Sequence, residues 1–217
     1  QGLWADLKGR KRGNCMKCKK RKTAMVQSAD DEKSEVSTLI KELTSLKGKE
    51  YTDTLKEITS LKIFTPVDGC ANVVTACSKK DADYANLKAT AEIASQYVDM
   101  VYILPNPKGV RSMDFIFVKK GIYNAYDLKT ISGANSVGNR LEESTGQTKR
   151  VLLQMKTKYN PRNLAKEIKT YFERNAEALE VLIFKGKRKM SINREAALFK
   201  DFEKSFVSIW HKAQKKR

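Results

Sequence analysis

The sequence contains a single histidine, His211, which lies in the basic C-terminal segment next to Trp210. A ribonuclease that passes protons between two histidines is therefore excluded. If the chain cleaves phosphodiester bonds, its acid and base must be metal-bound water, or lysine, tyrosine and carboxylate groups.

Long hydrophobic runs are also missing, because no apolar stretch approaches the roughly 18 residues of a membrane span. We therefore expect no membrane partner of the spanning kind. The first residues, from Gln1 to Leu7, lack an initiator methionine and the apolar centre of a signal peptide. We expect the sequence to be a fragment or a processed C-terminal piece of a longer chain.

Acidic residues are too few to balance the basic ones. Lys and Arg number 43 against 25 Asp and Glu, which gives a net charge of +18 and an isoelectric point near 9.7. This excess favours a polyanionic partner, with nucleic acid first and an anionic membrane surface second. Part of the charge lies in residues 1–33, which we expect to form either an arm along phosphates or a solvated tail.

Cysteine is scarce, with four in the chain. Cys15 and Cys18 form a C-x-x-C pair, while six residues separate Cys70 from Cys77. Together they would supply four ligands for a structural Zn²⁺ site, although the second spacing is outside the usual range and 51 residues separate the pairs. Reduced thiols are the alternative, and disulfides are a third option if the chain works outside a cell.

The first part of the chain predicts a helical hairpin. Apolar residues recur at helical spacing through 34–62, and the segment KELTSLK at 41–47 returns almost unchanged as KEITSLK at 56–62. Gly48 lies between the copies and should end the first helix. Pro66 and Gly69 indicate a loop over 63–77. We expect a basic helical N-terminal extension over residues 1–77 and a second domain over 78–217.

The second part alternates helices and strands. We expect helices at 81–100, 136–149, 163–175 and 199–214, and strands at 101–104, 115–118, 122–130, 151–155, 179–184 and 190–193. This order implies an α/β (α+β) fold in which helices flank a mixed β-sheet.

Two of these strands carry carboxylates that should meet. If Lys120-Gly121 is a two-residue turn, residues whose numbers sum to 241 face each other, so Asp114 lies opposite Asp127. Lys129 shares their face because side chains alternate with period two. Facing carboxylates destabilise a sheet unless a cation or a proton lies between them. The group suits metal-assisted phosphodiester hydrolysis, and a solvated surface cluster is the alternative.

The hairpin and its surroundings resemble the PD-(D/E)xK nuclease superfamily, whose core is an α-β-β-β-α-β sandwich of the restriction-endonuclease type. The resemblance covers roughly residues 80–195. It is most specific toward C-terminal nuclease toxin domains, namely the tRNase domain of contact-dependent inhibition proteins and domains appended to phage head proteins. The segments that carry it are DFIF (114–117), YDLKT (126–130), GQTKRVLL (146–153) and LIFKGK (182–187). Met113 stands where the family has proline, which supplies no ligand.

The resemblance also implies roles for single residues. Asp114 and Asp127 match the two acidic positions, and Lys129 matches the motif lysine. Glu92 matches a helical carboxylate that often completes the metal site, and Gln147 matches a polar position of the helix after the motif. The implied cofactor is Mg²⁺ or Mn²⁺, held by the three carboxylates.

Three interpretations of function stay open. The first is a metal-dependent nuclease toxin acting on tRNA or DNA, in which Arg140, Lys149 and Arg150 clamp phosphates or, alternatively, are solvated. The second is a metal-independent ribonuclease toxin of the barnase, colicin or RelE-like group. The third is a non-catalytic module that binds nucleic acid. A toxin implies an acidic immunity protein as partner. It also implies a chain that is secreted, delivered into a target-cell cytoplasm, or carried by a virion.

Overall fold

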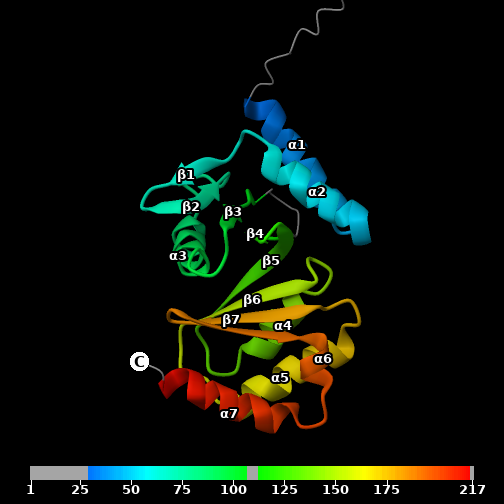
Figure 1. Ribbon diagram of the computed structural model, residues 1–217, viewed down its shortest axis with the longest axis vertical. Coiled ribbons are helices and arrows are strands. Elements are labelled where there is room, and N and C mark those ends of the chain that lie inside the picture. Colours follow the sequence, from blue (N-terminus) through cyan, green and yellow to red (C-terminus); the bar gives the residue numbers. More distant parts are fainter. Residues whose placement is uncertain (1–28, 107–111, 216–217) are drawn as a thin grey trace, which may run out of the picture.

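The protein is built on one eight-stranded β-sheet, in which the strands follow one another in chain order (Figure 1). The computed structural model describes residues 29–106 and 112–215. The strands are β1 (Thr65–Val67), β2 (Cys70–Thr75), β3 (Met100–Ile103), β4 (Phe115–Lys119), β5 (Ile122–Ile131), β6 (Arg150–Met155), β7 (Glu180–Lys185) and β8 (Arg188–Asn193). The helices are α1 (Ala29–Glu42), α2 (Gly48–Ser60), α3 (Tyr84–Ala94), α4 (Val137–Glu143), α5 (Pro161–Arg174), α6 (Arg194–Leu198) and α7 (Phe202–Lys215).

The sheet is mixed. Parallel pairing joins β2 to β3, β5 to β6 and β6 to β7, and the other neighbours are antiparallel. The three parallel connections contain α3, α4 and α5 in turn, because a parallel pair needs a long crossover. The predicted mixed sheet flanked by helices is therefore confirmed.

Helices cover both faces of the sheet. On one face, α3 packs with Phe115 and Phe117 of β4. On the other face, α1 and α2 pack with Ile116 and Ala125, while α4, α5 and α7 pack with Ile131. Ala125 and Ile131 are both on β5 and six residues apart, so they point to the same face. The helical hairpin and the C-terminal helices thus cover different parts of one face, as Figure 1 shows.

The helical hairpin is confirmed as α1 and α2, although α1 ends at Glu42 and Gly48, with a φ of +59°, is the first residue of α2. The predicted loop over 63–77 is wrong, because β1 and β2 form a hairpin there. Gly69 permits its turn with a φ of +85°, and Pro66 is tolerated because β1 is an edge strand. Both strands belong to the sheet that continues past residue 78, and the division into two domains at that point stays a prediction.

Several predicted helices are shorter in the structure. The helix expected over 81–100 ends at Ala94, because the backbone N–H of Asp99 already donates to Val118 and Met100 begins β3. The helix expected over 136–149 ends at Glu143, shortly before Gly146 with a φ of +80°. The helix expected over 199–214 begins at residue 202, and the short α6 precedes it.

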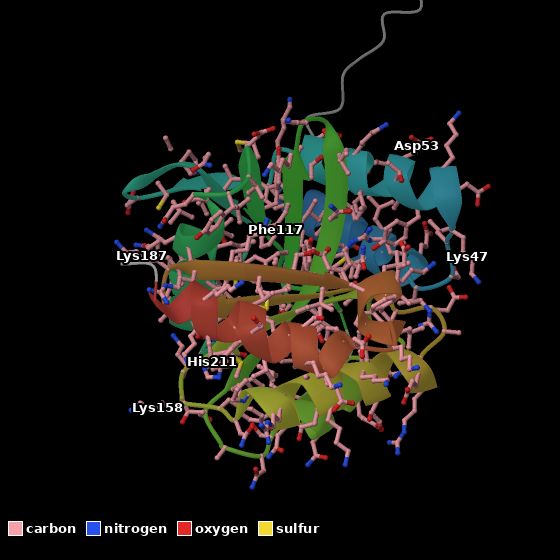
Figure 2. All side chains as sticks on the ribbon, turned by 60° about the horizontal axis from the view of Figure 1, so that its bottom comes forward. Lys47, Asp53, Phe117, Lys158, Lys187 and His211 are labelled. Atoms are coloured by element: carbon pink, nitrogen blue, oxygen red, sulfur yellow. The ribbon has the colours of Figure 1, made fainter. Side chains whose placement is uncertain are left out.

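Charged side chains project from opposite sides of the molecule. Figure 2 shows Lys158, Lys187 and His211 on one side, and Lys47 and Asp53 on the other. Within residues 29–106 and 112–215, no helix is both long enough and apolar enough to cross a membrane.

Candidate active site

The β4–β5 hairpin has the register that the sequence predicts. Its ladder runs from the pair Lys119–Ile122 to the pair Phe115–Tyr126, so the turn is Lys120-Gly121. The two turn residues have φ values of +49° and +74°. Positive φ at both positions is what a type I′ turn requires.

Strand β5 changes its partner at Asp127. Residues 122–126 pair with β4, and residues 127–131 pair with β6. Asp114 continues the contact where the β4 ladder ends: its N–H donates to Tyr126 O (2.9 Å), and its Oδ2 accepts the N–H of Leu128 (2.6 Å). The two aspartates therefore meet at the point on β5 where pairing with β4 ends and pairing with β6 begins.

The Asp127 side chain is buried, with the residue 3% exposed. Lys129 Nζ lies 3.1 Å from its Oδ2, yet no well-aligned hydrogen bond reaches that oxygen from the described residues. Burial raises the pKa of Asp127, while the Lys129 ammonium and the Ser144 hydroxyl oppose the rise. Among the described residues, the Lys129 ammonium is therefore the charged partner of Asp127 Oδ2, which has almost no solvent-exposed surface.

Asp114 lies beside Asp127 and is half-buried. Burial, followed by the neighbouring Asp127 carboxylate, raises the pKa of Asp114 to about 7, although the Leu128 N–H and Lys129 oppose the rise. Two carboxylates with one lysine beside them carry an uncompensated negative charge, which a low-dielectric site disfavours. A proton on Asp114 relieves this repulsion, and a divalent cation bound by the pair would replace that proton.

The predicted third ligand, Glu92, lies elsewhere. It is exposed in the last turn of α3, which covers the face opposite to that of Asp127, and its carboxylate lies 3.7 Å from Lys88. The first turn of α3, not the last, approaches the end of β5, where Asn86 Nδ2 donates to Thr130 Oγ1 (2.8 Å). In the described part of the chain, no three His, Cys, Asp or Glu side chains gather to hold a metal ion. Any metal here would have Asp114 and Asp127 as its carboxylate ligands.

Two predicted residues lie on or just after α4. Gln147 Nε2 donates to the backbone oxygen of Glu143 (2.6 Å), which fixes the amide against the end of the helix. Arg140 pairs with the Glu143 carboxylate at 2.9 Å on the exposed surface of α4. Neither side chain contacts the aspartate pair.

Lys149 and Arg150, the other two residues predicted to contact phosphate, pair with different carboxylates. Lys149 Nζ lies 3.2 Å from Glu177 Oε2. Arg150 Nε lies 3.4 Å from Glu180 Oε2, which also accepts the hydroxyl of Tyr126 (2.8 Å). Because Tyr126 and Asp127 are adjacent on one strand, the Arg150 group lies on the face opposite to the aspartate pair.

Two further neighbours of Asp127 were not predicted. Ser144 follows α4, and its hydroxyl is within hydrogen-bonding reach of the carboxylate. Tyr171 is buried on α5, and burial together with the Asp127 charge raises its pKa to about 12. Tyr171 belongs to the apolar stripe of an amphipathic helix, so no sequence pattern distinguishes it from a core residue.

The cysteines give no zinc site that the structure can test. Cys15 and Cys18 lie outside the described residues, and Cys70 and Cys77 are free thiols. Cys77 Sγ donates to Asp81 Oδ2 at 3.1 Å. Burial, then this contact, raises the pKa of Cys77 to about 12, which keeps the thiol protonated.

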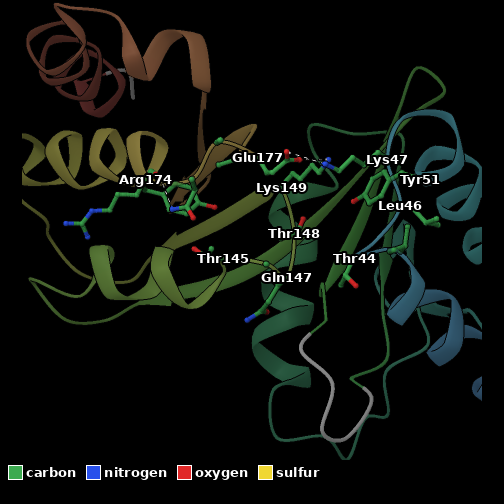
Figure 3. Close-up of a pocket in the computed structure, with 16 residues that line it drawn as sticks. Thr44, Leu46, Lys47, Tyr51, Thr145, Gln147, Thr148, Lys149, Arg174 and Glu177 are labelled. Atoms are coloured by element: carbon green, nitrogen blue, oxygen red, sulfur yellow. Dashed lines mark hydrogen bonds and ion pairs between the residues drawn. The ribbon is translucent and has the colours of Figure 1, made fainter.

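A pocket of about 440 Å³ opens between the helical hairpin and the loops that precede β6 and β7 (Figure 3). We call it the hairpin pocket. Its lining includes Thr44, Lys47, Tyr51, Thr145, Gln147, Thr148, Lys149, Tyr171, Asn175 and Glu177. Tyr171 thus lines the hairpin pocket and also experiences the charge of Asp127.

We compared the chain with models of known protein families, with curated proteins and with solved structures, and none of these comparisons finds a match. The chemistry of the aspartate pair and its surroundings is therefore the basis for a functional proposal.

Proposed function

We propose that the protein is a metal-dependent nuclease that hydrolyses phosphodiester bonds. The observation that carries the proposal is the pair of buried Asp127 and half-buried Asp114, with Lys129 Nζ 3.1 Å from Asp127. Holding two carboxylates together in a protein interior costs free energy. Such costs are typical of functional sites, where a bound cation relieves the repulsion.

The residues present fit a hard divalent cation such as Mg²⁺ or Mn²⁺. Asp114 and Asp127 offer carboxylate oxygens, which these ions prefer. Asp127 Oδ2 is buried, and an ion there would take the place of the Lys129 ammonium as its partner. When bound, the ion would supply an acidified water and offset negative charge on the phosphate.

Lys129 has two uses in this arrangement. In the free protein its ammonium group offsets the charge of Asp127. With a phosphodiester beside the aspartates, the same group can donate to a phosphate oxygen or orient the attacking water. Its side chain is 15% exposed, so it is shielded from bulk water, which strengthens its electrostatic effect.

The order of elements supports a restriction-endonuclease-like core as part of this proposal. The succession α3, β3, β4, β5, α4, β6 has the α-β-β-β-α-β order of that core. The net charge of +18 supports nucleic acid, tRNA or DNA, as the substrate. A toxin role, an acidic immunity partner, and delivery to a target cell or carriage by a virion complete the proposal.

The test is cleavage of total tRNA and of plasmid DNA, each with Mg²⁺ or with EDTA. We expect at least one substrate to be cut in Mg²⁺ and neither in EDTA. Lys129→Ala should lower the rate by about 100-fold or more, because it removes a preorganised positive charge. Lys119→Ala, an exposed lysine of the same hairpin, should cut as fast as the unmodified protein.

Two results would count against the proposal. Undiminished cleavage in EDTA would indicate a metal-independent ribonuclease instead. Full activity of Lys129→Ala would show that the lysine has no part in cleavage.

A further inference from the structure

The hairpin pocket contains an anion-binding arrangement that the proposed cleavage does not use. Lys47 Nζ lies 3.4 Å from Glu177 Oε1, and Lys149 Nζ lies 3.2 Å from Oε2 of the same carboxylate. Lys47 comes from the turn between α1 and α2, Lys149 precedes β6, and Glu177 precedes β7. Two ammonium groups from separate segments thus converge on one carboxylate, as Figure 3 shows.

The Glu177 carboxylate is replaceable. Its side chain is 66% exposed, and its interactions within the described residues are those with the two lysines, which lower its pKa. Ion pairs this exposed contribute little to stability. An anion with more charge and more acceptor oxygens can therefore take the place of the carboxylate, and a phosphate group is such an anion.

The pocket beside the lysines has the size and the chemistry for the rest of a nucleotide. Its volume of about 440 Å³ is within the range of small-molecule sites. Its wall carries the hydroxyls of Tyr51 and Thr148, which are within hydrogen-bonding reach of each other, and the amides of Gln147 and Asn175. Hydroxyls, amides and an aromatic ring are the groups that read the edges and faces of unpaired bases.

We infer that the hairpin pocket binds one nucleotide unit of the substrate, with Lys47 and Lys149 on its phosphate in place of Glu177. The base would lie against the polar wall of the pocket. The inference rests on the proposed function for the identity of the substrate. Tyr171 connects the two sites, because it lines the pocket and the Asp127 charge acts on its hydroxyl.

The test is a titration of the full chain in EDTA with the four ribonucleoside 5′-monophosphates, followed by backbone amide chemical shifts in NMR spectra. Inorganic phosphate and the free nucleosides are titrated in parallel. We expect saturable shifts at residues 47–51, 147–149 and 175–177 with at least one monophosphate. Absence of such shifts, or equal affinity for inorganic phosphate, would overturn the inference.

Variants make the test more specific, because the structure predicts that some bind the monophosphate more tightly and others more weakly. Glu177→Gln should bind the monophosphate about threefold more tightly, since it frees both lysines, whereas the double variant Lys47→Ala and Lys149→Ala should bind about tenfold more weakly. Glu203→Gln and Lys200→Ala alter charge at exposed positions of the C-terminal region and serve as matched controls. Equal changes in monophosphate affinity for Glu177→Gln and Glu203→Gln would mean that only the net charge of the protein matters. That result would overturn the inference.

The inference and the proposed function can fail separately, because the titration contains no metal and measures no cleavage. Nucleotide binding in the pocket of a protein that cuts no nucleic acid would refute the nuclease and keep the binding site. Cleavage by a protein whose pocket binds no nucleotide would support the nuclease and refute the binding site.

Discussion

The Asp114 carboxylate has two opposed effects on the folded protein. It completes the backbone of β5 by accepting the N–H of Leu128 at 2.6 Å, and it repels the carboxylate of Asp127. An asparagine at this position would keep an acceptor for Leu128 and remove the repulsion. At sites selected for activity, such a change is expected to increase stability while activity is lost.

We therefore predict that Asp114→Asn stabilises the protein in a pH-dependent way. Folding raises the pKa of Asp114 from 3.8 to about 7, so the stability from its protonated form is full below about pH 4 and lost as the pH rises through 7. Relative to the unmodified protein, the variant should gain about 3 kcal/mol at pH 8 and less than about 1 kcal/mol at pH 4. Urea denaturation at both pH values measures this.

Asp53→Asn is the control for that comparison, because it makes the same substitution on α2 at a side chain that is half exposed. A less stable Asp114→Asn protein at pH 8 would mean that the carboxylate contributes more through its hydrogen bond than it costs through repulsion.

The meeting of Asp114, Asp127 and Lys129 was predictable from the sequence for a local reason. A two-residue turn at Lys120-Gly121 sets the register, and the period of two sets the face. The position of Glu92 was not predictable in this way. The direction in which α3 crosses the sheet depends on tertiary packing, and it carries the last turn of the helix away from the end of β5.

Among the elements, the helical hairpin is packed as part of the core. Leu55 and Ile58 of α2 are fully buried with Ile116 and Ala125 of the sheet. The hairpin also supplies Tyr51 and other residues to the wall of the pocket. An extension that folds apart from residues 78–217 would not have these contacts.

We predict that Leu55→Ala destabilises the whole chain by about 2–4 kcal/mol, because it leaves a cavity between α2 and the sheet. Leu198→Ala, at a position that is 40% exposed on α6, should cost much less. Urea unfolding followed by circular dichroism gives the free energies. Hydrogen exchange of β6 amides shows whether the loss reaches the distant strands, and unchanged exchange there would favour two independent domains.

The strands β1 and β2 show why sequence analysis can miss a β-hairpin. Proline and glycine indicate loops, and both residues occur here within a short hairpin. The edge position makes Pro66 acceptable, and that position exists because β2 pairs in parallel with β3. Edge pairing is a property of the assembled sheet, so a local pattern does not reveal it. Strands β4, β6 and β7 were predictable because they contain continuous apolar runs.

For the whole molecule, the aspartate pair and the hairpin pocket lie on one face of the sheet, between the helical hairpin and the C-terminal helices. The net charge of +18 was evident from composition and favours a polyanionic partner. The pocket itself was not predictable, because its lining comes from three segments that the fold brings together.

The most direct test of the central claim is a calorimetric titration of the protein with Mg²⁺ near pH 6.5, in two buffers that differ in ionisation enthalpy. We predict one saturable site that releases close to one proton per ion, because the ion replaces the proton shared by Asp114 and Asp127. Asp114→Asn should lose this site. Absence of Mg²⁺ binding, or equal binding by Asp114→Asn, would contradict the account.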